Sequence, residues 1–232
     1  MTDPDPFLAV RAPEGGPRAI ALVLHGGRER SSGRVRRHQL AVVRMAPFTT
    51  GLVRAGLPHG LAVARMRYLV RGWNGDAQAP VLDVRRVLDR LADWYPGVPV
   101  ALVGHSMGGR AAVYAADHPS VQAVVGLAPW IEPADPFEAV AGRDVLVVHG
   151  NADRITSAKA SAAWTRRAAT VAASAAYVSV RREGHAMLRR AGLWHELTTR
   201  YVLARMLGLP VSGGSTAALV GKVLAGEPSL VV

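Results

Sequence analysis

A serine stands inside the stretch LVGHSMGGRAA, residues 102–112, between an apolar run and an alanine-rich segment. Ser106 is flanked by Gly104 and Gly108, and this Gly-x-Ser-x-Gly spacing is typical of a sharp strand-to-helix turn that exposes a serine hydroxyl above a sheet. A helix beginning after the serine would direct its positive end at that hydroxyl and favour developing negative charge. The spacing predicts a nucleophile, and a glycine-rich turn with an incidental serine is the alternative.

A serine is a poor nucleophile unless a base removes its proton and a carboxylate orients that base. Asp153 follows the apolar run of VLVVHGNAD, and His185 follows the run of YVSVRREGH. Each therefore lies in a loop expected at the end of its own strand. Three suitable residue types, each placed after a strand, predict a catalytic triad of Ser106, His185 and Asp153.

Acyl transfer through such a triad also needs two N–H donors for the developing oxyanion. The residue after the nucleophile supplies one, so the backbone N–H of Met107 is the first candidate. The second is expected in the loop after an earlier strand, where the chain reads ALVLHGGRER. We favour the N–H of Gly27, with that of Arg28 as the alternative, and interpret His25 as a structural turn residue.

The elements that must position these residues are visible as an alternation of two patterns. Short Val- and Leu-rich runs are typical of strands buried on both faces of a parallel sheet. They are residues 19–27, 61–69, 98–106, 121–129, 144–153 and 175–184. Amphipathic helical patterns lie between and after them, at 79–95, 157–169 and 186–207. This alternation predicts an α/β fold: a doubly wound, mostly parallel sheet of about six to seven strands with helices on both faces.

Length and composition set the outer limits. A chain of 232 residues fits one domain, 1–232, in which residues 208–232 form a C-terminal extension. Within that extension a short helix is expected from Ser215, its N-cap, to Gly226. Whether the extension docks on the body, mediates self-association or stays unordered is left open, and so is the oligomeric state.

The net charge of +11 raises the question of a nucleic-acid partner. The densest basic cluster, RERSSGRVRR at 28–37, lacks interleaved aromatic residues and matches no nucleic-acid-binding motif, so no such partner is expected. The sequence shows no secretory leader, no apolar run of the ~20 residues that a membrane helix needs, and no cysteine. We therefore expect a cytoplasmic protein without a membrane partner.

The motifs HGG, GHSMGG, HGNAD and EGHA, spread over residues 19–190, resemble those of the α/β-hydrolase superfamily. The resemblance implies an acyl-enzyme on Ser106, with His185 as general base and then acid, Asp153 orienting its imidazole, and no metal or organic cofactor. Serine at the elbow disfavours the dehalogenase and epoxide-hydrolase branches, which use aspartate there. Only WIEPADPFEAVAGR, residues 130–143, is available for the family's helical lid. A compact, nearly lidless enzyme like the small carboxylesterases and dienelactone hydrolases is implied.

The expected function is that of a serine hydrolase acting on a small-molecule carboxylic ester or thioester. Acyl transfer or C–C bond hydrolysis on the same triad is the alternative, and a non-catalytic binding protein on a hydrolase scaffold is a third. Arg28 and its basic neighbours are candidates for attracting anionic substrates, with a solvated loop as the simpler interpretation. Trp73 and Trp130 follow strands and are candidates for lining the substrate pocket, although packing explains a tryptophan there equally well.

Overall fold

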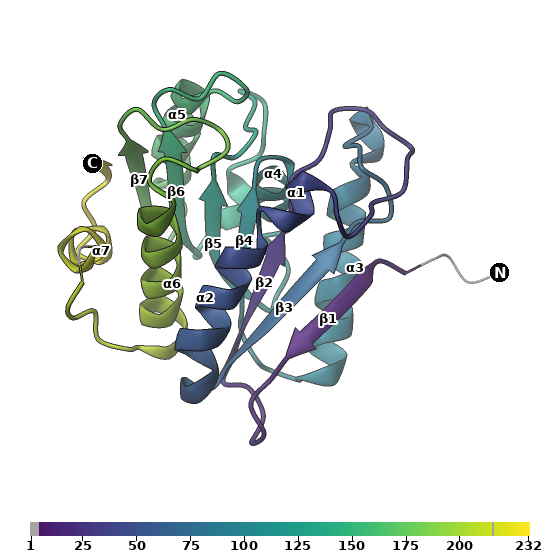
Figure 1. The fold of residues 1–232 in the computed structure, drawn as a ribbon, viewed down its shortest axis with the longest axis horizontal. Coiled ribbons are helices and arrows are strands. Elements are labelled where there is room, and N and C mark those ends of the chain that lie inside the picture. The colour runs from purple at the N-terminus through teal and green to yellow at the C-terminus, as the bar shows by residue number, and fades with distance from the viewer. Residues whose placement is uncertain (1–4, 215) are drawn as a thin grey trace.

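The computed structural model describes residues 5–214 and 216–232, and its centre is one twisted sheet (Figure 1). The sheet has eight strands in the order β1-β3-β2-β4-β5-β6-β7-β8. Only β1 runs antiparallel to its neighbour, β3, and the other pairs are parallel. The strands are β1 (Phe7–Arg11), β2 (Ala19–Leu24), β3 (Leu61–Arg67), β4 (Val100–His105), β5 (Val121–Leu127), β6 (Asp144–Gly150), β7 (Ser174–Val180) and β8 (Ser229–Val231).

Helices cover both faces of this sheet, which confirms the doubly wound α/β class. One face packs against α3 (Ala79–Trp94), α4 (Met107–Tyr114) and α5 (Ala158–Ala168). The other packs against α2 (Ala46–Gly56), α6 (Ala191–Leu207) and α7 (Ala217–Leu224), with the short α1 (Leu40–Val43) preceding α2. Side chains of β2 alternate between the two cores: Ile20 and Leu22 join the first, and Ala21 and Val23 the second.

All six strands expected from the apolar runs are present, and two more join them at the edges. At one edge β1 pairs with β3, in register from Phe7 with Arg67 to Arg11 with Val63. At the other, β8 of the C-terminal segment pairs with β7. The predicted count of six to seven was therefore slightly low, because the sequence signal of both edge strands is short.

The C-terminal segment is docked on the body in this structure. Helix α7 lies against α6 and buries Val220 completely and Val223 almost completely (Figure 1). The N–H of Val232 then donates to the carbonyl of Ser179 at 2.9 Å, which extends the pairing of β8 with β7. The helix begins at Ala217 with Thr216 in the cap position, whereas Ser215, expected as the cap, lies outside the described residues.

The parallel arrangement brings the loops that follow β2, β4, β6 and β7 to the same edge of the sheet, which is where ligands bind in open α/β sheets. Between β5 and β6 the chain forms only a short 3₁₀ helix, η3 (Glu138–Val140), so no helical lid covers that edge from this segment. Of the helices in the described ranges, none combines the length and the apolar character needed to cross a bilayer.

Replacing Val220 with Ala tests the docking of the C-terminal segment. The side chain is fully buried, so we expect the free energy of unfolding to fall by about 1–3 kcal/mol. Urea denaturation measures the loss, and Lys222→Ala on the exposed side of α7 is the matched control. A loss no larger than that of the control would contradict a docked α7.

Candidate active site

Ser106 sits at the turn between β4 and α4 in a conformation that non-glycine residues rarely adopt. Its φ is 56° and its ψ is −120°. Such backbone strain persists only where the surroundings over-determine it. Here the Ser106 N–H donates to the carbonyl of Leu127 at 3.1 Å, while the Ser106 carbonyl accepts from the N–H of Gly109 at 3.0 Å and of Trp130 at 3.1 Å. These bonds hold the hydroxyl out above the sheet edge.

The two glycines around Ser106 are required by close backbone approach. A Cβ on Gly104 would overlap the carbonyl of Gly108, and a Cβ on Gly108 would stand 2.6 Å from the carbonyl oxygen of His25. Contacts this close are with backbone atoms, which cannot rotate away. Strand β4, helix α4 and the end of β2 therefore meet at a point where only glycine fits.

Three loops bring the predicted nucleophile, base and acid together. His185 Nε2 lies 3.1 Å from Ser106 Oγ, and His185 Nδ1 lies 2.8 Å from Asp153 Oδ2. Because a carboxylate only accepts hydrogen bonds, Nδ1 carries the proton and Nε2 is free to accept the serine hydroxyl. The arrangement is that of a nucleophile, a general base and an orienting acid.

The carboxylate of Asp153 is fully buried and accepts hydrogen bonds from five donors. Oδ1 accepts from the backbone N–H groups of Ile155 and Thr156, and Oδ2 from the Thr156 hydroxyl, His149 and His185. Burial raises the pKa of Asp153, but these hydrogen bonds outweigh it and hold that pKa well below its ordinary value. The group is ionised at neutral pH and can stabilise a positive charge on His185.

A second histidine, not predicted from the sequence, lies on the same carboxylate. His149, fully buried at the end of β6, places Nε2 3.1 Å from Asp153 Oδ2 and Nδ1 3.0 Å from Ser161 Oγ. Asp153 therefore lies between two imidazoles, each with a serine on its far side: His185 with Ser106, and His149 with Ser161. The sequence did contain a signal for His149: in VLVVHGNAD a histidine stands four residues before Asp153, at the end of a buried strand.

His105, next to Ser106, supports the loop that carries His185. Its Nε2 lies 3.0 Å from the carbonyl oxygen of His185, and the two rings are 4.7 Å apart between centroids. Burial, with a smaller contribution from the neighbouring His185, lowers the pKa of His105 to about 3. The His105 ring is neutral at pH 7, so it donates to this carbonyl without placing a positive charge beside the His185 ring.

Around the expected oxyanion position, the N–H of Met107 is the first of α4 and so has no acceptor within the helix. The Arg28 N–H donates to the carbonyl of Arg71 at 2.8 Å, which leaves Gly27 as the better of the two candidates for the second donor. The loop lies against the nucleophile, since a Cβ on Gly26 would stand 3.3 Å from that of Ser106.

Both ring nitrogens of His25 form hydrogen bonds with backbone groups, as expected of a structural residue. Its Nδ1 lies 2.7 Å from the carbonyl oxygen of Gly26, and its Nε2 accepts from the N–H of Tyr68 at 3.4 Å. Burial lowers the pKa of His25 to about 4, so the ring is neutral at pH 7. Its hydrogen bonds fix the start of the loop that carries Gly27.

The two candidate pocket tryptophans flank a buried arginine. The Arg110 guanidinium lies 4.4 Å from the centroid of Trp73 and 4.5 Å from that of Trp130, and it pairs with Asp135 at 2.6 Å. Trp73 is 4% exposed, so its surface is used for packing, the simpler of the two roles considered for it. Trp130 is half-buried, and its backbone N–H donates to the Ser106 carbonyl at the elbow.

The basic loop after β2 is ordered through its backbone while its arginine side chains face solvent. Residues 28–33 pair with the segment 71–74: the N–H of Trp73 donates to the Arg28 carbonyl at 2.8 Å, and the N–H of Arg71 to the Gly33 carbonyl at 2.9 Å. The Arg28 side chain is exposed, and the loop that carries it begins at the sheet edge occupied by Ser106.

Comparison with known proteins agrees with this architecture. Residues 69–143 match the family model described as serine aminopeptidase, S33, a stretch that contains Ser106 but neither Asp153 nor His185. The human monoglyceride lipase is 32% identical over 145 residues, which are 60% of this chain and 45% of the lipase. The chain thus spans less than half the length of this curated relative.

Solved structures resemble the chain over most of its length. Est1E from Butyrivibrio proteoclasticus, solved with ferulic acid bound, has a TM-score of 0.64 at 16% identity. The matched region covers 87% of this chain and 95% of the Est1E chain. An α/β serine hydrolase without lid from Xanthomonas campestris has a TM-score of 0.61 at 21% identity, covering 87% and 89%. A monoacylglycerol lipase from Paleococcus ferrophilus has a TM-score of 0.62 at 12% identity, covering 87% and 99%. The chain therefore has the fold of these α/β hydrolases.

The buried neutral histidines predict a loss of stability in mild acid. The pKa of His25 falls from 6.5 to about 4, and that of His105 from 6.5 to about 3, so below pH 6.5 the unfolded chain binds protons that the folded one does not. The stability that they contribute is present above pH 6.5 and lost as the pH falls. We expect a decrease of about 2 kcal/mol per histidine between pH 7.5 and 5.

Urea denaturation at a series of pH values measures this decrease. His25→Gln removes one of the two titrating groups and is expected to flatten the profile relative to its own value at pH 7.5. A wild-type profile that stays level from pH 7.5 to 5 would contradict the burial of neutral imidazoles at both positions.

Proposed function

We propose that the protein is a serine hydrolase that cleaves a small-molecule carboxylic ester or thioester through an acyl-enzyme on Ser106. The observation that carries this proposal is the continuous hydrogen-bonded line from Ser106 through His185 to Asp153, at 3.1 and 2.8 Å. The match to the human monoglyceride lipase and the fold shared with esterases support the same class of reaction.

In the first half of the reaction, Ser106 Oγ attacks the carbonyl carbon while His185 Nε2 takes the hydroxyl proton. The carbonyl oxygen becomes an oxyanion, which accepts hydrogen bonds from the N–H groups of Met107 and Gly27. The positive charge on His185 is balanced by the carboxylate of Asp153. As the tetrahedral intermediate collapses, the bond to the alcohol or thiol breaks and the leaving group takes the proton from His185.

The second half repeats these steps with water as the nucleophile. His185 Nε2 removes a proton from water as its oxygen attacks the acyl carbon, and the bond to Ser106 Oγ then breaks. The proton returns to Ser106 and the carboxylic acid leaves. The chain's own residues perform every proton transfer.

Substrates are proposed to reach Ser106 from an open edge of the sheet. The segment 130–143 forms no helical lid, and the relative from Xanthomonas campestris is itself described as lacking one. Trp130 lies beside the elbow and is proposed to border the substrate. The exposed Arg28 and its basic neighbours are proposed to attract esters that carry a free carboxylate.

The first test is intact-protein mass spectrometry after exposure to a fluorophosphonate, with wild type beside Ser106→Ala. We expect one adduct on wild type and none on the variant. Hydrolysis of a graded series of neutral and carboxylate-bearing esters and thioesters should then be reduced on the order of 10⁴-fold or more by Ser106→Ala. An unlabelled, folded wild type would contradict the proposal and favour a binding role.

His149 is proposed as a positioning residue for the acid. His149→Phe fills a similar volume but removes the Nε2 donor, so we expect kcat for a neutral ester to fall about tenfold while KM changes little. His149→Gln offers an amide donor and is expected to restore part of the rate. Equal loss in both variants, or a change confined to KM, would assign His149 a packing role only.

A further inference from the structure

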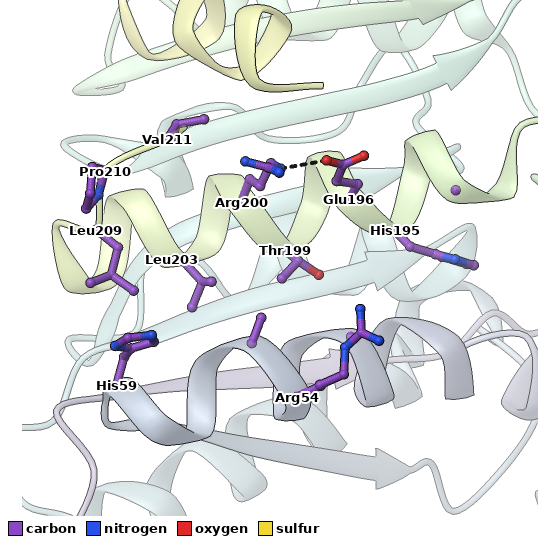
Figure 2. A pocket seen from close by; sticks show the side chains of 13 residues that line it. Arg54, His59, His195, Glu196, Thr199, Arg200, Leu203, Leu209, Pro210 and Val211 are labelled. Atoms are coloured by element: carbon purple, nitrogen blue, oxygen red, sulfur yellow. Dashed lines mark hydrogen bonds and ion pairs between the residues drawn. The ribbon is translucent and has the colours of Figure 1, made fainter. Parts of the chain in front are cut away.

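A groove of about 640 Å³ runs between α2 and α6, on the face of the sheet opposite α3, α4 and α5 (Figure 2). None of Ser106, Asp153 and His185 lines it. The segment after α6 closes one end through Leu209, Pro210 and Val211. Its size lies within the range of small-ligand sites in proteins, ~300–1,000 Å³.

Small residues on α2 leave this space open. Gly51 and Ala55, one turn apart, line the groove from α2, and a Cβ on Gly51 would stand 3.2 Å from Thr199 Oγ1. On α6, Thr199 and Leu203 repeat at the four-residue spacing that places side chains on one helix face. The helices approach closely at Gly51, and the absence of large side chains keeps the neighbouring space unfilled.

One end of the groove carries a positive charge. Figure 2 shows Arg54 extending from α2 toward α6, on the side where His195 lies. Among the described residues that line the groove, Glu196 alone is acidic, and it is paired with Arg200 at 2.8 Å. That pair is itself anchored, since Arg200 donates to the carbonyl of Ser212 at 2.9 Å. Arg54 therefore adds a cation that no second carboxylate of the lining balances.

His195 adds a neutral donor near this charge. Its ring packs edge-on against Phe48, with 4.5 Å between centroids, and burial lowers its pKa. The other end is apolar: Figure 2 shows Leu203 and Leu209 pointing toward the α2 side, where His59 lies across from them. The groove thus joins a cationic, hydrogen-bonding end to an apolar end.

We propose that this groove binds an amphipathic carboxylate, with its head group at Arg54 and its apolar chain along Leu203, Leu209 and Val211. A guanidinium presents paired N–H donors that match the planar carboxylate, which favours this head group. The apolar chain removes hydrocarbon surface from water at the other end. The site is separate from Ser106, and the proposal does not depend on the hydrolase activity.

Isothermal titration calorimetry with decanoate, below its micelle concentration, tests the site on the full chain. Arg54→Gln removes the charge, and we expect the Kd to rise at least about tenfold. Gly192→Leu places a side chain in the groove lining where a Cβ meets nothing within 4 Å, so it should block binding without disturbing the fold. Arg166→Gln, exposed on α5 at the opposite face, carries the same change of charge and should leave the Kd unchanged.

Decanol and decyltrimethylammonium provide the matching ligand controls, because they keep the chain and change only the head group. Both are expected to bind at least about tenfold more weakly than decanoate. Equal binding of decanol would overturn the assignment of Arg54 as the head-group site. Decanoate binding that survives both Arg54→Gln and Gly192→Leu would place the ligand elsewhere, the Ser106 site included, and would equally overturn the proposal.

Discussion

The backbone of Ser106 can hold its φ of 56° only because three segments meet around it without side chains between them. At Gly104 and Gly108, the strand before the serine, the helix after it and the end of β2 come into backbone contact. This close approach sets the position of Ser106 relative to the loop of Gly27. It also explains why the elbow needs a parallel neighbour on each side: β5 supplies the Leu127 carbonyl that accepts from Ser106, and β2 supplies the backbone against Gly108.

The second constraint is the burial of a charge. The Asp153 carboxylate has no exposed surface, and an unpartnered carboxylate in such a place would be strongly unfavourable. Its donors come from β6, from the loop that follows and from the loop after β7, so the Asp153 carboxylate joins these elements and holds the His185 ring. Burial lowers the pKa of His25 to about 4 and that of His105 to about 3, so neither ring adds a positive charge near this carboxylate at pH 7.

Helix α6 and the segment after it connect three parts of the molecule: the loop of His185, the proposed carboxylate groove and the docked C-terminal segment. Helix α6 follows the loop of His185, carries one wall of the proposed carboxylate groove and packs against α7. The Arg200–Glu196 pair holds the turn around Ser212, from which the chain continues to α7 and β8. The docked segment is therefore continuous with the apolar end of the groove.

The sequence alone determined the six central strands, their alternation with helices and the order of Ser106, Asp153 and His185. Those features follow from local periodicity and from glycine spacing, which need no knowledge of distant contacts. The two edge strands carry little periodic signal, because they are only five and three residues long. Segments this short become strands because β3 and β7 offer them unpaired backbone groups at the two edges of the sheet.

Only the tertiary structure decided which polar groups meet. The second imidazole on Asp153, the arginine between Trp73 and Trp130, and the groove at Gly51 and Thr199 each join residues from different elements. A sequence pattern specifies which face of a helix or strand is apolar, but contact across elements depends on how closely they pack. For that reason the residue types of the proposed chemistry were readable from the chain, whereas their hydrogen-bond partners, protonation and surrounding space required the folded arrangement.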